Sequence, residues 1–409
     1  MKNKQIPEIR LLGFTGKWEQ RKLGEVFEQT SNHLNPKEEN LELWSLTVEN
    51  GLTPKTDRYN REFLVKKEDQ FKSVSNNEFI YNPMNMTLGA VDLNLTGKKV
   101  AVSGYYITMK SKNGFDSKFF SVWLKSSSAI KMYKTYATGS LIERQRVQFS
   151  TLSQIKALVP SEEEQIQIGD FFKKLDDTIT IQQRELDILK QTKQGFLQKM
   201  FPKEGESVPE IRFPGFTGDW EQRKLGDMSN GFEYGLSASA TEYDGKNKYI
   251  RITDIDDDTR EFLKDNLTSP NIDLPAVENY LVKEGDILFA RTGASVGKSY
   301  IYNKKDGKVY YAGFLIRARI RPEYDPEFIF QNTLTSKYSK FIKITSQRSG
   351  QPGVNAKEYA NFTMMVPTYD EQAKIGNFFK HLDETIALHQ RGLEALQETK
   401  NAFLQKMFV

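Results

Sequence analysis

The sequence predicts an α+β protein in which two pseudo-symmetric mixed α/β domains are separated by two long helices that form an antiparallel coiled coil. Three observations predict this fold: the chain repeats two of its segments, two long segments carry a heptad of apolar residues, and the blocks between them alternate strand-like and helix-like patterns. The predicted domains are residues 1–159 and 202–366, and the predicted long helices are residues 160–201 and 367–409.

Two repeats organise the chain of 409 residues. The short repeat, residues 6–26 and 208–228, is identical at 15 of 21 positions and contains WEQRKLG twice. The long repeat, residues 160–201 and 367–408, is identical at 24 of 42 positions. Because matched and unmatched segments have sharp borders, we expect the repeats to occupy equivalent places in a two-fold pseudo-symmetric molecule. Drift after a plain gene duplication is the alternative interpretation.

Apolar residues of the long repeat recur in alternating steps of four and three, which is the heptad pattern of a coiled-coil seam. A large domain separates the two segments, so an antiparallel pair within the chain is the simplest arrangement, and association between chains is the alternative. Ser161 and Thr368, each followed three residues later by a glutamate, predict capping boxes at the helix starts. The apolar seam residues are Ile168, Phe172, Leu175, Ile179, Leu186, Leu189, Phe196, Ile375, Phe379, Leu382, Ile386, Leu393, Leu396 and Phe403. The polar seam residues, expected to fix the register, are Gln182, Lys193, His389 and Lys400.

The unlike blocks between the repeats each carry a basic stretch, although the whole chain has a net charge of only +4. Residues 98–146 hold ten basic and two acidic side chains, and residues 291–348 hold twelve and four, so each stretch carries +8. Residues 253–286, with ten acidic and three basic side chains, carry −7. Basic stretches interleaved with Tyr, Gln, Asn and Ser favour contacts to nucleic-acid phosphates and base edges. A solvated lysine-rich surface is the alternative.

Composition and spacing argue against several classes of site. Without cysteine the chain has no disulfide, thiolate metal site or cysteine nucleophile, and its three histidines are too few for a readable Ser–His–Asp set. Residues 293–299 resemble a P-loop but have three residues between the glycines instead of four and precede a strand-like segment. The acidic residues 256–258 fit a solvated loop better than a metal site. We therefore expect no catalysis by this chain and no metal or cofactor bound to it.

The N-terminus is polar, and no apolar run approaches the ~20 residues that a membrane-spanning helix needs. We expect a cytoplasmic protein without a membrane partner.

Four sequence features together make the chain resemble, over essentially its whole length, the specificity subunit of bacterial type I restriction–modification enzymes. They are the duplicated WEQRKLG, the stretch GDILFARTGASVGK, the stretch SGQPGVNAKEYANFTMMVP, and the pattern EQxxIGxFFxxLDxTI…FLQKMF of the long repeat. The resemblance implies two target-recognition domains, each reading one half of a split, asymmetric site in double-stranded DNA. It implies helices that set the separation of the domains and dock two methyltransferase (modification) subunits. It also implies restriction/translocase subunits as partners, with S-adenosylmethionine, ATP and Mg²⁺ held by the other subunits.

Loop residues of the basic stretches are the candidate DNA contacts, because Arg or Lys can read guanine and Gln or Asn can read adenine. In the first domain they are Tyr105, Lys110, Arg144, Gln145 and Arg146; in the second they are Arg291, Thr292, Lys298, Arg348, Gln351 and Asn355. Two other functions are alternatives. A nuclease acting alone would turn over DNA with magnesium, and an adaptor for acidic proteins would lack salt-sensitive, sequence-selective DNA binding.

Overall fold

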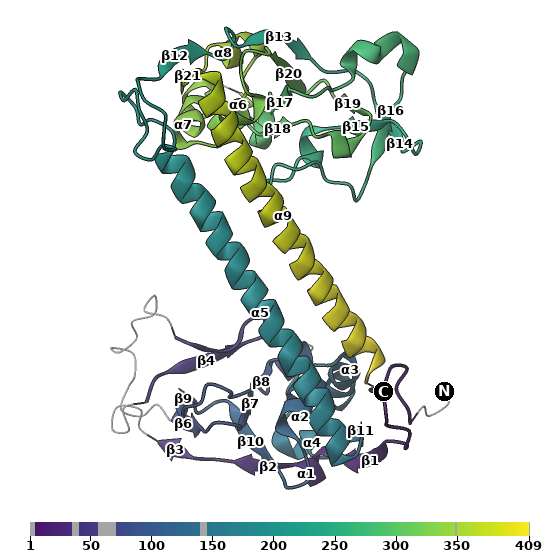
Figure 1. The fold of residues 1–409 in the computed structure, drawn as a ribbon. Coiled ribbons are helices and arrows are strands. Elements are labelled where there is room, and N and C mark those ends of the chain that lie inside the picture. Colours follow the sequence, from purple (N-terminus) through teal and green to yellow (C-terminus); the bar gives the residue numbers. More distant parts are fainter. Residues whose placement is uncertain (1–4, 35–40, 56–70, 140–144, 348–349, 409) are drawn as a thin grey trace. The chain divides into compact units, whose positions relative to one another are not determined.

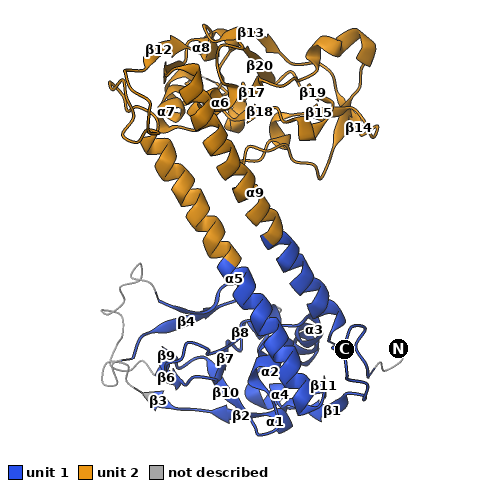
Figure 2. Cartoon of the chain, viewed as in Figure 1, with its two compact units in different colours: residues 1–181, 393–409 blue, residues 182–392 orange. Residues whose placement is uncertain are grey.

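The computed structural model describes residues 5–34, 41–55, 71–139, 145–347 and 350–408. The chain forms two compact units (Figure 2). Unit 1 contains residues 1–181 and 393–409, and unit 2 contains residues 182–392. Each long helix begins in one unit and ends in the other. The four-part division with borders at residues 159, 201 and 366 stays a prediction.

Unit 1 is built on a four-stranded antiparallel sheet with the order β2-β10-β7-β8. Its strands are β2 (Phe27–Thr30), β10 (Ile107–Ser111), β7 (Phe79–Tyr81) and β8 (Val91–Leu93). Three smaller sheets join β1 (Glu19–Lys22) to β11 (Lys156–Val159), β4 (Trp44–Thr47) to β5 (Gly51–Pro54), and β3 (His33–Leu34) to β6 (Phe71–Val74) and β9 (Val100–Ser103). Short helices are α1 (Leu23–Val26), the 3₁₀ turn Met86–Leu88, α2 (Ser117–Trp123), α3 (Ser127–Tyr136) and α4 (Phe149–Leu152).

Aromatic side chains fill the core of unit 1. Phe27 of β2 meets Phe79 and Phe120 edge to face at 5.3 and 5.2 Å, and Phe119 meets Phe120 at 5.0 Å. The helix that supplies Phe119 and Phe120 begins where Asp116 accepts a hydrogen bond from Phe119 N, an N-cap. The short repeat adds Trp18, which is buried against Phe119.

Unit 2 repeats this plan with a four-stranded antiparallel sheet in the order β13-β20-β17-β18. Its strands are β13 (Ser229–Tyr234), β20 (Leu315–Ile320), β17 (Asp286–Ala290) and β18 (Ser299–Ile301). Smaller sheets pair β12 (Glu221–Lys224) with β21 (Thr363–Val366), β14 (Ala240–Glu242) with β16 (Thr268–Pro270), and β15 (Lys248–Ile250) with β19 (Val309–Tyr311). The α-helices are α6 (Pro326–Asn332), α7 (Ser336–Thr345) and α8 (Ala356–Ala360), and the 3₁₀ turns are Ile252–Asp254, Leu274–Tyr280, Gly293–Ser295 and Lys304–Asp306. The two unlike blocks therefore share a sheet order, and the predicted fold class is confirmed.

The long helices are α5 (Glu162–Lys199) and α9 (Tyr369–Lys406), each of 38 residues (Figure 1). Within unit 1, Phe171 meets Phe403 at 5.0 Å and Asp176 pairs with Lys400 at 2.6 Å. Residue numbers thus rise on α5 while they fall on α9, so the helices run antiparallel. The corresponding contacts of unit 2 are Phe196 with Phe378 at 5.0 Å and Lys193 with Asp383 at 2.5 Å. All fourteen predicted apolar seam side chains are buried or half-buried.

The helix starts differ from the predicted capping boxes in one respect. Ser161 Oγ accepts a hydrogen bond from Glu164 N at 3.4 Å, as an N-cap should. The carboxylate of Glu164, however, binds the guanidinium of Arg10 at 2.6 Å through both oxygens instead of returning to the cap. Arg212 and Glu371 repeat this bidentate pair at the start of α9. The short repeat therefore anchors each long helix through a buried ion pair.

Each long helix also closely approaches the start of a short helix, which is α2 for α5 and α6 for α9. Gln165 receives a hydrogen bond from Asp116 N (2.9 Å), and Gln372 receives one from Asp325 N (3.1 Å). One turn later, a Cβ added to Gly376 would lie 2.3 Å from Asp325 Oδ1. Only glycine permits this approach, which explains the IG dipeptide shared by both long repeats.

Candidate nucleic-acid interface

In unit 2, several of the predicted DNA contacts lie together where strands of the main sheet end. Arg291 directly follows β17, and its carbonyl oxygen accepts a hydrogen bond from Val354 N at 2.9 Å. Gly293 N donates to the carbonyl of Pro352 at 3.0 Å, so residues 291–293 run beside residues 352–354. Phe314, in the turn before β20, accepts a hydrogen bond at its carbonyl from Arg291 N at 3.0 Å. We call residues 291–293, 313–314 and 351–355 the strand-end surface of unit 2.

The Arg291 side chain is oriented by an aromatic ring. Its guanidinium carbon lies 5.0 Å from the centre of the Tyr234 ring, at the end of β13. The Tyr234 hydroxyl accepts a hydrogen bond from Ala356 N at 3.3 Å, which ties the ring to α8. Among the described residues no carboxylate forms a salt bridge with Arg291. A stacked guanidinium keeps its N–H groups at the edge for bidentate contacts.

Tyr359 of α8, which the sequence did not indicate as a candidate, fixes the loop after β17 through its hydroxyl group. Its buried hydroxyl donates to Ala290 O at 2.6 Å and accepts from Gly297 N at 3.1 Å. Burial raises the pKa of the Tyr359 phenol well above its usual range, so the hydroxyl stays protonated and able to donate. Gly297 has φ +87°, and a Cβ there would lie 2.7 Å from Ile342. The backbone of the loop is thus fixed by the side chains of Tyr359 and Ile342, which lie far away in the sequence, so no short motif reveals these contacts.

The other predicted residues of unit 2 differ in their surroundings. Gln351 is exposed, and its Nε2 lies 3.1 Å from the position that a Cβ of Gly293 would occupy. Thr292 forms a backbone bridge with Gly353. The Asn355 side chain caps α8 by accepting a hydrogen bond from Glu358 N at 3.0 Å. The cap uses one lone pair of Asn355 Oδ1, so contact with an adenine would use its second lone pair together with Nδ2.

Lys298 points away from the strand-end surface. It is only 8% exposed, and its ammonium lies 3.0 Å from Ile255 O and 2.5 Å from an Asp257 carboxylate oxygen. A phosphate contact by Lys298 would require exchange of these partners. The acidic residues 256–258 form a tight loop in which Asp256 accepts hydrogen bonds from Asp258 N and Thr259 N.

Unit 1 has an equivalent strand-end surface, residues 82–84, 104–105 and 145–148. Its defining contact is the hydrogen bond from Val147 N to Pro83 O at 2.9 Å, which corresponds to the one from Val354 to Arg291. Ile107 pairs with Tyr81 and Ile316 with Phe289, so the continued register places Tyr105 opposite Pro83 and Phe314 opposite Arg291. The exposed ring of Tyr105 therefore lies in the same region as Gln145 and the exposed Arg146.

Lys110 lies at the opposite end of β10 from Tyr105, where it pairs with Glu28 at 2.6 Å. The strand rises about 10 Å between Ile107, next to the turn that holds Tyr105, and Lys110. The equivalent Arg319 of β20 also forms an ion pair, with Asp286 at 2.9 Å. Lys110 is thus not brought together with the other predicted contacts. Arg144 and Arg348 lie outside the described residues.

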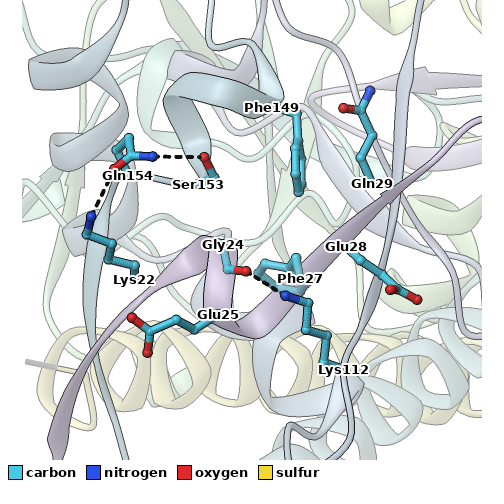
Figure 3. A pocket seen from close by; sticks show the side chains of 10 residues that line it. All are labelled: Lys22, Gly24, Glu25, Phe27, Glu28, Gln29, Lys112, Phe149, Ser153 and Gln154. Atoms are coloured by element: carbon cyan, nitrogen blue, oxygen red, sulfur yellow. Dashed lines mark hydrogen bonds between the residues drawn. The ribbon is translucent and has the colours of Figure 1, made fainter.

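A cavity of about 460 Å³ opens beside β2 in unit 1 (Figure 3). Lys112 Nζ donates to Gly24 O at 2.7 Å, and Lys22 Nζ donates to Gln154 Oε1 at 3.1 Å. Two lysines and the two carboxylates of Glu25 and Glu28 line it, so their formal charges cancel. This cavity lacks the excess positive charge that a phosphate site needs.

Two further classes of feature are absent from the part of the chain that the structure describes. It contains no group of three or more His, Asp or Glu side chains arranged to hold a metal ion. None of its helices is long and apolar enough to span a membrane.

Comparison with known proteins identifies the family. The profile of the type I restriction modification DNA specificity domain matches residues 15–191 and again residues 217–398, most of the chain. The chain belongs to this family. The family assignment made from the sequence is confirmed, and its specificity subunits are non-catalytic components of restriction–modification systems that recognise DNA.

Individual relatives agree with this assignment. The type I restriction enzyme MjaVIII specificity subunit of Methanocaldococcus jannaschii is 22% identical over 363 residues, which is 82% of this chain and 80% of the relative. The crystal structure of the type I restriction-modification system S subunit from M. genitalium has the same fold, with a TM-score of 0.68 at 16% identity and 99% of each chain covered.

Proposed function

We propose that this specificity subunit reads a bipartite, asymmetric DNA site, with each unit contacting one half-site through its strand-end surface. The observation that carries the proposal is the equivalence of the two surfaces. Both are built on the same sheet order and the same valine-to-carbonyl hydrogen bond. Their side chains nevertheless differ, since Pro83 stands where the other unit has Arg291. Two surfaces with the same backbone arrangement and different side chains are suited to two half-sites of different sequence.

The exposed polar side chains supply the chemistry of base reading. Arg291, held against Tyr234, suits bidentate contact with O6 and N7 of guanine, and Gln351 suits contact with adenine. In unit 1, Arg146 and Gln145 have the corresponding roles. Lys131, Lys134 and Lys343 are exposed and form no salt bridge with a described residue, so they are proposed to contact phosphates, which position the duplex without reading it.

The two long helices are proposed to set the spacing of the half-sites. A helix of 38 residues rises about 57 Å, which exceeds one duplex turn of about 34 Å. The same helices are proposed to dock two methyltransferase subunits, with restriction/translocase subunits completing the assembly. S-adenosylmethionine, ATP and Mg²⁺ belong to those subunits in this proposal. The assembly is proposed to work in the cytoplasm.

The test starts from the assembled complex of this chain with its methyltransferase subunits. Mapping methylated adenines in the host genome identifies the site, and binding is then measured on duplexes mutated in either half. Arg291→Ala should lower affinity and relax selectivity in one half-site only, by about 1–3 kcal/mol. Lys304→Ala is the control, because Lys304 is exposed and pairs with Glu284 away from the strand-end surface. Affinity and half-site selectivity of Arg291→Ala that both equal those of the native chain would contradict the assignment.

A further inference from the structure

Each unit presents one exposed aromatic ring at the same point of its sheet. Tyr105 and Phe314 occupy the third position of a β-turn directly before β10 and β20. The turns, residues 103–106 and 312–315, are each closed by a hydrogen bond between their first and last residues, at 3.1 and 2.8 Å. The two rings are 47% and 59% exposed. In both turns a glycine precedes the aromatic residue.

Neither the turn nor the core accounts for these rings. Turn positions favour Gly, Asn, Asp and Ser, whose side chains cost little in water. Exposed single apolar residues are common in proteins, but the two variable blocks share few residues and still place a ring at equivalent positions. A role common to both units therefore explains the pair better than chance. Removing an exposed ring from water lowers the free energy, so a ring kept at this position is best explained by contact with the surface of a ligand.

The neighbours of Phe314 indicate what covers it. Its carbonyl oxygen receives a hydrogen bond from Arg291 N at 3.0 Å, and the carbonyl oxygen of Arg291 receives one from Val354 N at 2.9 Å. The neighbouring Arg and Gln side chains suit base edges in the major groove. An aromatic ring beside them would contact the apolar group that this groove presents, the 5-methyl group of thymine. A ring wedged between base pairs is instead typical of minor-groove proteins.

We infer that Phe314 and Tyr105 are specificity residues that each contact the 5-methyl group of a thymine in the half-site read by their own unit. The inference rests on the proposed function and adds an apolar contact to it. Phe314 reads the methyl group by its ring alone. Tyr105 carries a hydroxyl that can also hydrogen-bond to a neighbouring base or phosphate.

The test replaces each thymine of the mapped site in turn by deoxyuridine, which lacks only the methyl group. Binding of the assembled complex is measured for the native chain and for Phe314→Ala. One deoxyuridine in one half-site should weaken native binding by about fourfold, and Phe314→Ala should bind that duplex and the thymine duplex equally. Tyr105→Ala should do the same in the other half-site, and Phe314→Leu should keep part of the discrimination.

Controls separate this inference from the proposed function. Ile344→Ala removes an apolar side chain of matched exposure, 61%, from α7 of the same unit and should leave the deoxyuridine profile unchanged. An identical profile for native chain and Phe314→Ala would overturn the inference while leaving DNA reading intact. A second outcome would also overturn it. If 2-aminopurine placed in the half-site became more fluorescent on binding of the native chain but not of Phe314→Ala, the ring would be inserted between base pairs instead of contacting a methyl group. Absence of any sequence preference in the native complex would overturn the proposed function itself.

Discussion

Phe196 and Phe378 meet edge to face across the helix pair of unit 2, with their ring centres 5.0 Å apart and their planes at 88°. The long repeat has an offset of 207 residues, so the counterparts of these rings are Phe403 and Phe171. Those two rings meet in unit 1 at the same 5.0 Å. The long repeat thus produces the same contact twice, so that in each unit an equivalent pair of phenylalanine rings joins α5 to α9.

The glycine that lets α9 approach α6 is expected to tolerate no side chain. Gly376→Ala should destabilise unit 2 by about 1–3 kcal/mol, because its Cβ would lie 2.3 Å from Asp325 Oδ1 and disturb the cap of α6. Gly392→Ala is the matched control on the same helix. No atom lies within 4 Å of its Cβ, so it should stabilise by about 0.5–1 kcal/mol. Urea unfolding of the two variants measures the difference; equal effects would contradict the packing argument.

The ion pair between Arg212 and Glu371 is expected to matter because the carboxylate is 0% exposed. Arg212→Met should destabilise the chain by about 3–5 kcal/mol, since it leaves a buried charge without a partner. Replacing both residues by methionine should recover much of that loss. Arg223 of the same repeat pairs with Glu221 at the surface, so Arg223→Met should cost less than about 1 kcal/mol. Thermal unfolding checks the series, and a cost for Arg223→Met as large as that for Arg212→Met would refute it.

Glu327 of α6 gives unit 2 a pH-dependent stability. Burial raises the pKa of Glu327 to about 7, while Lys380 at 3.6 Å opposes the shift. The folded chain therefore keeps this proton between about pH 4.5 and pH 7, where the unfolded chain has released it. Stability should fall as pH rises through that window and then level off.

Glu327→Gln should remove this slope and stabilise the chain by about 2 kcal/mol at pH 8, as measured by urea unfolding at several pH values. Glu323→Gln, on the exposed turn before α6, is the control. A slope that persists in Glu327→Gln would assign the pH dependence to other groups.

Tyr234 is expected to act as a positioning residue for Arg291. Tyr234→Leu should weaken binding in the half-site of unit 2 about twofold to fivefold, because a stacked cation contributes about 0.5–1 kcal/mol. Tyr234→Phe keeps the ring and should bind nearly as the native chain does. The double variant Tyr234→Leu with Arg291→Ala should be no weaker than Arg291→Ala alone. Additive losses would show that the two side chains act independently.

The spacing role of the helices predicts a change of site. Four residues inserted after Ile181, and four after Gly392 on the partner helix, lengthen the pair by about 6 Å, close to two base-pair steps. The gap between half-sites in methylated genomic DNA should grow accordingly, with the half-site sequences unchanged. Sequencing of the modified adenines measures it, and an unaltered gap would refute the role.

The long helices could be predicted because their signals are local. The heptad of the seam lies within the helices' own sequence, and all the predicted apolar seam positions are buried or half-buried. The partner of Glu164 could not be predicted in the same way. A glutamate three residues after Ser161 has the capping-box spacing, yet Arg10, 154 residues away, binds it instead. Such a pair depends on tertiary structure and leaves no spacing in the sequence.

The candidate site shows the same division. Charge counts indicated the stretch 291–348 that begins with Arg291, and the structure places Arg291 beside residues 352–354, the segment that directly follows Gln351. Counting could not orient a side chain, so Lys298 was included although its ammonium points to Ile255 O. Phe314 was missed because an aromatic residue before a strand is an ordinary strand signal. Its significance came only from the register that makes it equivalent to Tyr105.

Unit 1 is completed by residues 393–409, which follow all of unit 2 along the chain. Met407 and Phe408 lie in its core, and Ile9 N donates to Lys406 O at 3.1 Å. Unit 2, by contrast, is one uninterrupted stretch of chain. During translation the ribosome therefore releases every residue of the second domain before it supplies the last core residues of the first. The domain that is synthesised first must be finished last, the reverse of the usual order for multidomain chains.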